Sequence, residues 1–182
     1  VNSYKLNFSV GFVLIYSKEE DNNLFPNHKN VHFFYHPNQP LGSKWLASVY
    51  HSQLFNPKAI MILGSDDMVS KKYLMEGYLN ITINNFDFCY SESWLTYSES
   101  NDKLYLQKYS QPFKILGAGR IFSGKFLKKI DNKIYDPVIC RSLDNTFTRI
   151  KKEKNAISYV MKEVGILLYK GNWECISKVQ TL

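Results

Sequence analysis

The sequence predicts an α/β fold in which a mixed, mainly parallel sheet is flanked by helices. Three observations lead to this fold class. Short apolar runs rich in β-branched and aromatic residues are typical of buried strands. The first half of the chain alternates strand, strand, helix and strand, which favours parallel pairing. The 182 residues, 45% of them hydrophobic and 21% charged, suffice for one sizeable core, so we expect a single domain over residues 1–182.

Four elements are expected in the first half of the chain. Apolar, β-rich runs bounded by polar loops and prolines predict the strands, and apolar residues at helical spacing predict the helix. Ser43 is the expected N-cap of that helix, after a turn marked by Pro40 and Gly42. The strands are expected at 8–17, 31–37 and 59–63, and the helix at 43–55.

The second half predicts further helices and a hairpin. Strand-like runs flank the polar segment "ESND", which is a hairpin signal. The glycine-rich segment "GAGR", residues 117–120, is expected to be a loop. Helices are expected at 70–80, 123–130 and 142–155, and strands at 86–98, 103–110 and 164–170.

Charge and cysteine content narrow the class of protein. The net charge of +7 suits an anionic partner, but the lysines are scattered, so a nucleic-acid partner is not expected. Cys89, Cys140 and Cys175 are far apart and form no CxxC pair, which favours reduced thiols over disulfides or structural zinc. The longest apolar run, residues 10–16, is too short to span a bilayer. We therefore expect a cytoplasmic chain with no membrane span.

Two adjacent acids follow the third predicted strand in "AIMILGSDDMVS", residues 59–70. Ligands of open α/β sheets bind beyond the carboxyl ends of strands, where Asp66 and Asp67 are expected to lie. Neighbouring carboxylates repel unless a cation compensates, and oxygen ligands suit Mg or Mn. The alternative is that Asp67 caps the following helix and Asp66 binds loop amides.

Several segments together resemble the GT-A-fold, family-2-like nucleotide-sugar glycosyltransferases, especially those encoded by large DNA viruses and phages. The resemblance runs over residues 31–150, in consistent order. It rests on a "PN-PLG-K" turn before a helix, the acidic strand end, the "GAGR" loop and a later "LD". The matching residues outside the acidic strand end are Pro37, Asn38, Pro40, Leu41, Gly42, Lys44, Gly117, Ala118, Gly119, Arg120, Leu143 and Asp144.

This resemblance implies a GT-A-like (Rossmann-like) fold and a donor site built around the acids. It implies that Asp67 and Asp66 hold a Mn or Mg ion, which grips the diphosphate of a UDP-sugar or similar nucleotide-diphosphate sugar. Asp67 aligns with the last acid of the Asp-any-Asp pattern, whereas Ser65 replaces the first. Asp66 would meet the ribose, the sugar or a metal-bound water. The other implied donor contacts are Asn38, Gly42, Lys44, Ser65, Gly119 and Arg120.

An inverting sugar transfer also needs a carboxylate base that takes the proton of the acceptor hydroxyl. Asp144 is the first candidate, because the resemblance places it where the family has its acceptor-side acid. Its alternative role is N-capping of the helix expected at 142–155. Glu92, in "ESWLTYS", is the second candidate for the base.

The sequence therefore predicts a metal-dependent glycosyltransferase that acts on a glycan or protein acceptor. The alternative is a non-catalytic, GT-A-derived module that binds glycans or partner proteins. The segment "SVGFVLIYS" resembles the second strand of the family more than its first. Either residues 4–16 form an altered first strand, or the chain lacks part of the nucleotide-binding strand.

Overall fold

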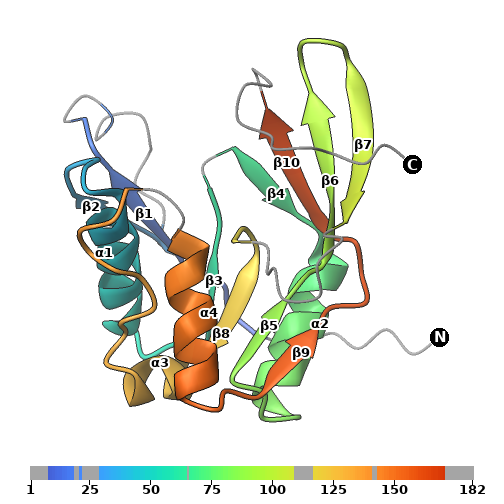
Figure 1. Cartoon of the computed structure of the whole chain (residues 1–182). Helices are drawn as coiled ribbons and strands as arrows, with labels where there is room; N and C mark the ends of the chain where they lie inside the picture. Colours follow the sequence, from blue (N-terminus) through green and yellow to red (C-terminus); the bar gives the residue numbers. More distant parts are fainter. Residues whose placement is uncertain are drawn as a thin grey trace.

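The computed structural model describes residues 8–18, 21, 29–64, 66–108, 117–140 and 143–170, without the side chains of 143–145 and 170. In this part of the chain, runs of two or more strands are separated by helices (Figure 1). The helices are α1 (Leu41–Gln53), α2 (Lys71–Thr82), α3 (Gly124–Lys129) and α4 (Leu143–Glu153). The strands are β1 (Phe12–Tyr16), β2 (Val31–Tyr35), β3 (Ala59–Ile62), β4 (Asp67–Val69), β5 (Phe88–Tyr90), β6 (Ser93–Ser98), β7 (Lys103–Lys108), β8 (Arg120–Ser123), β9 (Ser158–Val160) and β10 (Ile166–Lys170).

The described strands form three hydrogen-bonded sheets, with the strand orders β1-β2, β4-β10-β6-β7 and β3-β8-β5-β9. The α/β class and the mixed pairing agree with the prediction. The prediction that the sheet is mainly parallel is wrong. Of the seven strand pairs in the described residues, four are antiparallel and three parallel. Two of the antiparallel pairs involve β8, which lies between β3 and β5 and runs opposite to both. The other two are β4 with β10 and β6 with β7.

In the core sheet, β3-β8-β5-β9, the strands β3, β5 and β9 run in the same direction and end at one edge. β3 and β5 are each antiparallel to β8 and so run the same way, and β9 is parallel to β5. We call this edge, where β3, β5 and β9 end and β8 begins, the rim. Polar groups that follow these strands therefore gather at the rim, as in other open α/β sheets.

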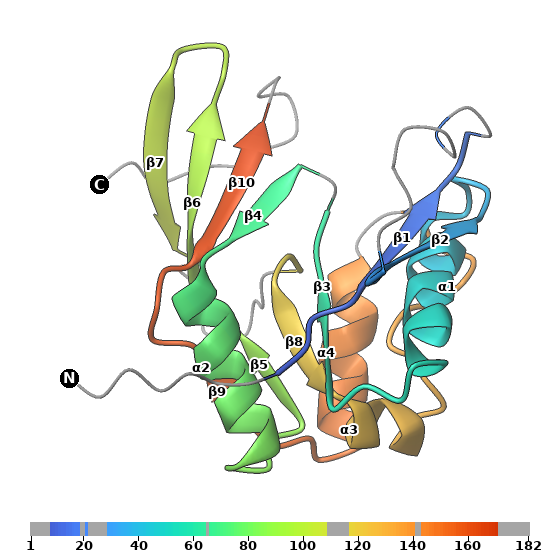
Figure 2. The same ribbon diagram turned by 180° about the vertical axis from the view of Figure 1, so that it is seen from behind.

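Both faces of the core sheet are covered by helices (Figures 1 and 2). On one face, the Phe88 ring packs edge-on against Phe147 of α4, with the ring centroids 4.7 Å apart. Phe122 of β8 packs against the same Phe147 ring, with the ring centroids 5.1 Å apart. On the other face, Tyr73 and Ile81 of α2 form a second apolar cluster with the sheet. No helix in the described part of the chain is long and apolar enough to cross a membrane.

The sheet β4-β10-β6-β7 stands beyond the rim, and three short connections join it to the core sheet. Residues 63–66 lead from β3 to β4, residues 91–92 from β5 to β6, and residues 161–165 from β9 to β10. The predicted 86–98 strand is therefore two strands in different sheets. The predicted hairpin is confirmed, since β6 pairs antiparallel with β7.

Two local expectations are wrong. The N-cap position of α1 is Pro40 rather than Ser43, because the helix already begins at Leu41. Ser43 lies in its first turn, where the hydroxyl is 3.1 Å from Nε2 of His36. The second is Arg120, expected in a loop, which begins the buried strand β8.

The two described cysteines are expected to differ sharply in reactivity. Cys89 is buried in β5, whereas Cys140 is exposed. Burial, and then the charge of Glu76, raise the pKa of the Cys89 thiol to about 12, so almost none of it is thiolate at pH 8. Labelling with iodoacetamide at pH 8, followed by peptide mapping, should modify Cys140 and spare Cys89 until the protein is denatured. Equal labelling of both in the native protein would contradict the buried position of β5.

Candidate functional site

The side chains of Asp66 and Asp67 converge at the rim, over Gly64. A Cβ atom built on Gly64 would lie 2.8 Å from Oδ2 of Asp67 and 3.1 Å from Oδ1 of Asp66. The backbone N–H of Gly64 donates a hydrogen bond to Oδ2 of Asp67 at 3.0 Å. The absence of a side chain at position 64 thus lets both carboxylates fold back over the end of β3. Any larger residue there would push them apart.

The alternative role of Asp67 as a helix cap is wrong. Asp67 begins β4, a short strand that separates the acids from α2. The cap of α2 is Ser70, whose hydroxyl accepts a hydrogen bond from the Tyr73 N–H at 3.2 Å. Ser65, the residue in place of the first aspartate, lies outside the described residues.

The glycine-rich turn before β8 lies beside the end of β3. The Gly119 N–H donates to the carbonyl of Ile62 at 2.9 Å, two residues before Gly64. Gly119 has φ of +72°, which a residue with a side chain adopts only at a cost. Its carbonyl accepts a 3.0 Å hydrogen bond from the Tyr73 hydroxyl. Burial raises the pKa of Tyr73, so the hydroxyl stays protonated and holds the turn against α2.

Arg120 is a buried part of the core sheet. Its side chain has 0% exposure, and the guanidinium carbon lies 4.9 Å from the centroid of the Phe147 ring. A cation over the face of an aromatic ring is attracted by the ring's electrons. This position favours a structural role, and the predicted contact with a diphosphate stays a prediction.

Glu92 follows β5 at the rim, and Lys151 of α4 is its electrostatic neighbour. The Lys151 ammonium lies 5.2 Å from the centroid of the Tyr90 ring and 5.4 Å from that of Phe88. Burial lowers the pKa of Lys151, and the charge of Glu92 acts in the opposite direction. Burial, followed by Glu92, also raises the pKa of Tyr90. The Lys151 ammonium thus lies over the aromatic rings of β5, and its charge interacts with that of Glu92.

Asp144 is the second residue of α4, and its side chain lies outside the described part. The alternative role as an N-cap does not fit, because the helix already begins at Leu143. The amino end of α4 points to the same side of the molecule as the end of β3 (Figure 1). The backbone thus brings Asp144 to the side that carries Asp66 and Asp67, and its role as a base stays a prediction.

The β2–α1 turn contributes a separate pair of predicted donor contacts. The Lys44 ammonium donates to Oδ1 of Asn38 at 3.1 Å, and both side chains are on the protein surface. Gly42 is instead a close-packed residue: a Cβ there would lie 1.9 Å from the carbonyl oxygen of Asp136. The need for glycine at position 42 is thus explained by packing. A contact of any of the three with a nucleotide stays a prediction.

The acids at Gly64 are suited to a hard divalent cation but do not form a complete set of ligands. Carboxylate oxygens are the ligands that Mg and Mn prefer, and Mg sites commonly use only one or two of them. Within the ranges that the structure describes, no group of three or more His, Cys, Asp or Glu side chains is arranged to hold a metal. A cation between Asp66 and Asp67 would therefore need further oxygens from water or from a bound phosphate.

Comparison with solved structures finds a similar fold in a glycosyltransferase. The structure of S. aureus TarS 1–349, a staphylococcal glycosyltransferase, matches with a TM-score of 0.63 and 15% sequence identity. The match covers 87% of the present chain but only 51% of that chain, so the present chain spans about half of it. No protein-family model matches the sequence, and no curated protein does. The likeness therefore concerns the fold.

Sequence reasoning missed two residues that shape the rim. Lys151 belongs to the run "KKEK", which is typical of a solvated surface, and only the packing of α4 on β5 brings it over the Tyr90 ring. Tyr73 follows helical spacing in α2, but its hydrogen bond to Gly119 joins positions 46 residues apart. Neither contact leaves a signal in the local sequence pattern.

Proposed function

We propose that the chain is a glycosyltransferase domain that moves a sugar from a nucleotide-diphosphate sugar to a glycan or protein acceptor. The observation that carries the proposal is the convergence of the Asp66 and Asp67 carboxylates over Gly64, at the end of a core strand. The likeness to a glycosyltransferase fold supports it. We take the donor to be a UDP-sugar, on the basis of the resemblance in residues 31–150.

The rim would carry out two tasks in this reaction. Sugar transfer breaks the bond between the anomeric carbon and the diphosphate, so negative charge grows on the leaving group. A Mn or Mg ion held by Asp67 and Asp66 would supply positive charge for that diphosphate. Asp67 keeps its carboxylate oriented through the hydrogen bond that its Oδ2 accepts from the Gly64 N–H.

The second task is to accept the proton of the attacking hydroxyl. Glu92 and Asp144 are the two candidates. Glu92 follows β5, which ends at the rim, and Asp144 is the second residue of α4, whose amino end points to the same side (Figure 1). An acceptor hydroxyl must come within hydrogen-bond distance of the base that takes its proton.

A second candidate function is a non-catalytic module that binds a glycan or a partner protein. The observation that favours it is the burial of Arg120, which removes one of the predicted cations from the surface. Such a module would keep the fold and the rim without turning over a donor. Binding of UDP separates the two candidates.

The test measures both binding and turnover. Calorimetry should detect UDP binding in the presence of Mn, and UDP release from UDP-sugars should require Mn. Both should fall to background with EDTA or in Asp67→Ala. Equal turnover in all of these samples would remove the metal-dependent mechanism. No heat on adding UDP with Mn would favour the non-catalytic module.

A further inference from the structure

A groove lies between α1 and α4, and neither of the acids at Gly64 lines it. Its volume is about 840 Å³, within the range of sites that hold small ligands. One wall is the face of α1 that carries Ser43 and Ala47, and the other is the face of α4 that carries Thr146 and Arg149. The two helices lie next to each other in both views (Figures 1 and 2). None of the predicted donor-site residues lines it.

The floor of the groove is apolar. Leu46, Ile130 and Ile150 line it and are 8%, 5% and 9% exposed. The Tyr50 ring stands at the side, 46% exposed, with its hydroxyl donating to the carbonyl of Asp131 at 3.2 Å. That hydrogen bond orients the ring while leaving much of it uncovered. A planar or apolar ring can therefore stack on Tyr50 and cover the floor.

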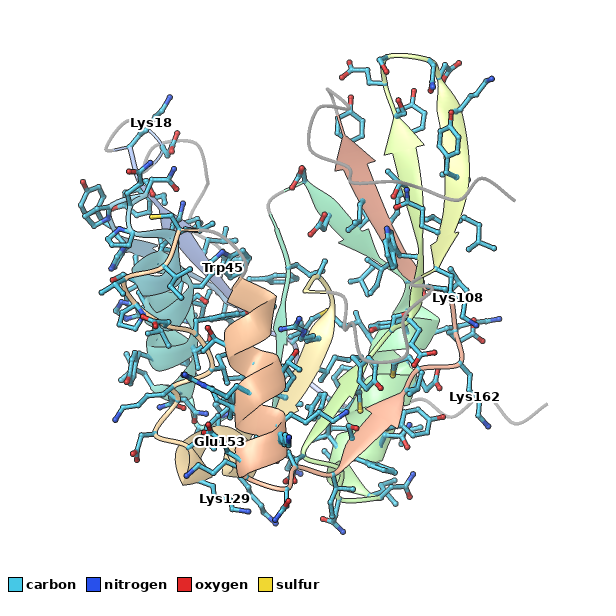
Figure 3. All side chains as sticks on the ribbon, in the orientation of Figure 1. Lys18, Trp45, Lys108, Lys129, Glu153 and Lys162 are labelled. Atoms are coloured by element: carbon cyan, nitrogen blue, oxygen red, sulfur yellow. The ribbon has the colours of Figure 1, made fainter. Side chains whose placement is uncertain are left out.

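The mouth of the groove is positively charged. Four basic side chains line it, against the two acids Asp131 and Asp136. They are Lys129, Lys133, Arg149 and Lys154. Lys129 lies on α3, near the carboxyl end of α4 where Glu153 is labelled (Figure 3).

Two of these basic residues form ion pairs that an anionic ligand can replace. The Lys133 ammonium is 3.9 Å from Asp131, and the Arg149 guanidinium is 3.8 Å from Glu153. Long, solvent-exposed pairs of this kind contribute little, so an incoming phosphate can replace them. An apolar floor beneath a basic mouth matches a ligand with a ring and a phosphate.

We infer that this groove binds a phosphorylated ring compound, at a site separate from the donor site at the rim. Two sources share this chemistry, a mononucleotide and a sugar phosphate. The ring lies over Leu46, Ile130 and Ile150, and the phosphate meets Lys129 and Arg149. Because the acids at Gly64 take no part, the inference stands or fails independently of the proposed glycosyl transfer.

The test is a titration followed by NMR of isoleucine δ1-methyl groups. The probes are AMP, glucose 1-phosphate and inorganic phosphate. At least one of the two ring compounds should shift the methyl signals of Ile130 and Ile150 at millimolar concentration, and it should bind more tightly than inorganic phosphate. The more tightly bound of the two identifies the ring. The methyl of Ile62, at the end of β3, should not move.

Paired charge variants test the role of the basic mouth. Lys129→Gln combined with Arg149→Gln should weaken binding about tenfold, since two charge-assisted contacts are lost. The matched control is Lys125→Gln with Lys152→Gln, two exposed lysines on the same helices that do not line the groove. It should change the affinity less than about twofold.

Three results would overturn the inference. The first is the absence of shifts at Ile130 and Ile150 with both ring compounds. The second is an equal loss of affinity in the control variant, which would mean that binding follows overall charge. The third is equal affinity for inorganic phosphate, which would remove the role of the apolar floor.

Discussion

Asp67→Asn is expected to lower metal-dependent donor turnover by about 100-fold or more while the fold stays intact. Asparagine has the shape of aspartate, and its Oδ1 can still accept the 3.0 Å hydrogen bond from the Gly64 N–H. The turn at the end of β3 therefore survives, but the negative charge that would hold a divalent ion is lost. The variant thus separates the charge of Asp67 from its structural role.

The measurements are UDP release at saturating Mn and the midpoint of thermal unfolding. The midpoint should stay within about 3 °C of the wild type, since a neutral hydrogen bond replaces a charged one at a partly exposed site. Asp66→Asn is the matched comparison, because its carboxylate lies over the same Gly64 but is more exposed. A smaller loss is expected there. Wild-type turnover in Asp67→Asn would contradict the proposed role.

Gly42→Ala is expected to destabilise the protein by about 3 kcal/mol, an effect on the fold rather than on chemistry. The new Cβ would lie 1.9 Å from the carbonyl oxygen of Asp136 and 3.0 Å from that of Ile139. Both obstacles are backbone, so neither can rotate away. The Gly42 N–H also donates to the Ile139 carbonyl at 2.8 Å, and the segment must shift to relieve the clash.

Thermal unfolding followed by circular dichroism tests this expectation. The midpoint should fall by roughly 6–12 °C for a loss of this size. Gly11→Ala is the control, because a Cβ there meets only the Asn30 carbonyl, at an ordinary 3.7 Å. Equal midpoints for the two variants would show that the segment at Asp136 does not pack closely on α1.

The regular elements with strong local patterns could be predicted from the sequence. The helix expected at 70–80 is α2, because Ser70 supplies a cap and apolar residues recur at helical spacing. Strand β8 was missed because all four of its residues are buried, so no alternation marks it, and glycines stand on both sides. Its strand character comes from pairing with β3 and β5, positions that are distant along the chain.

The candidate site was predictable where one short segment builds it. Asp66 and Asp67 follow a strand directly, so their position at its end could be derived from the local pattern. Contacts between distant segments were not predictable. The burial of Arg120 under Phe147 is one example, because it depends on where α4 packs.

The three short connections at the rim have a mechanical consequence. Two of these connections carry Asp66 and Glu92, and the strand that begins with Asp67 follows directly. Backbone that crosses from one sheet to the other must bend when the two sheets tilt. Any rocking of the β6-β7 hairpin against the core sheet would therefore alter the spacing of these carboxylates.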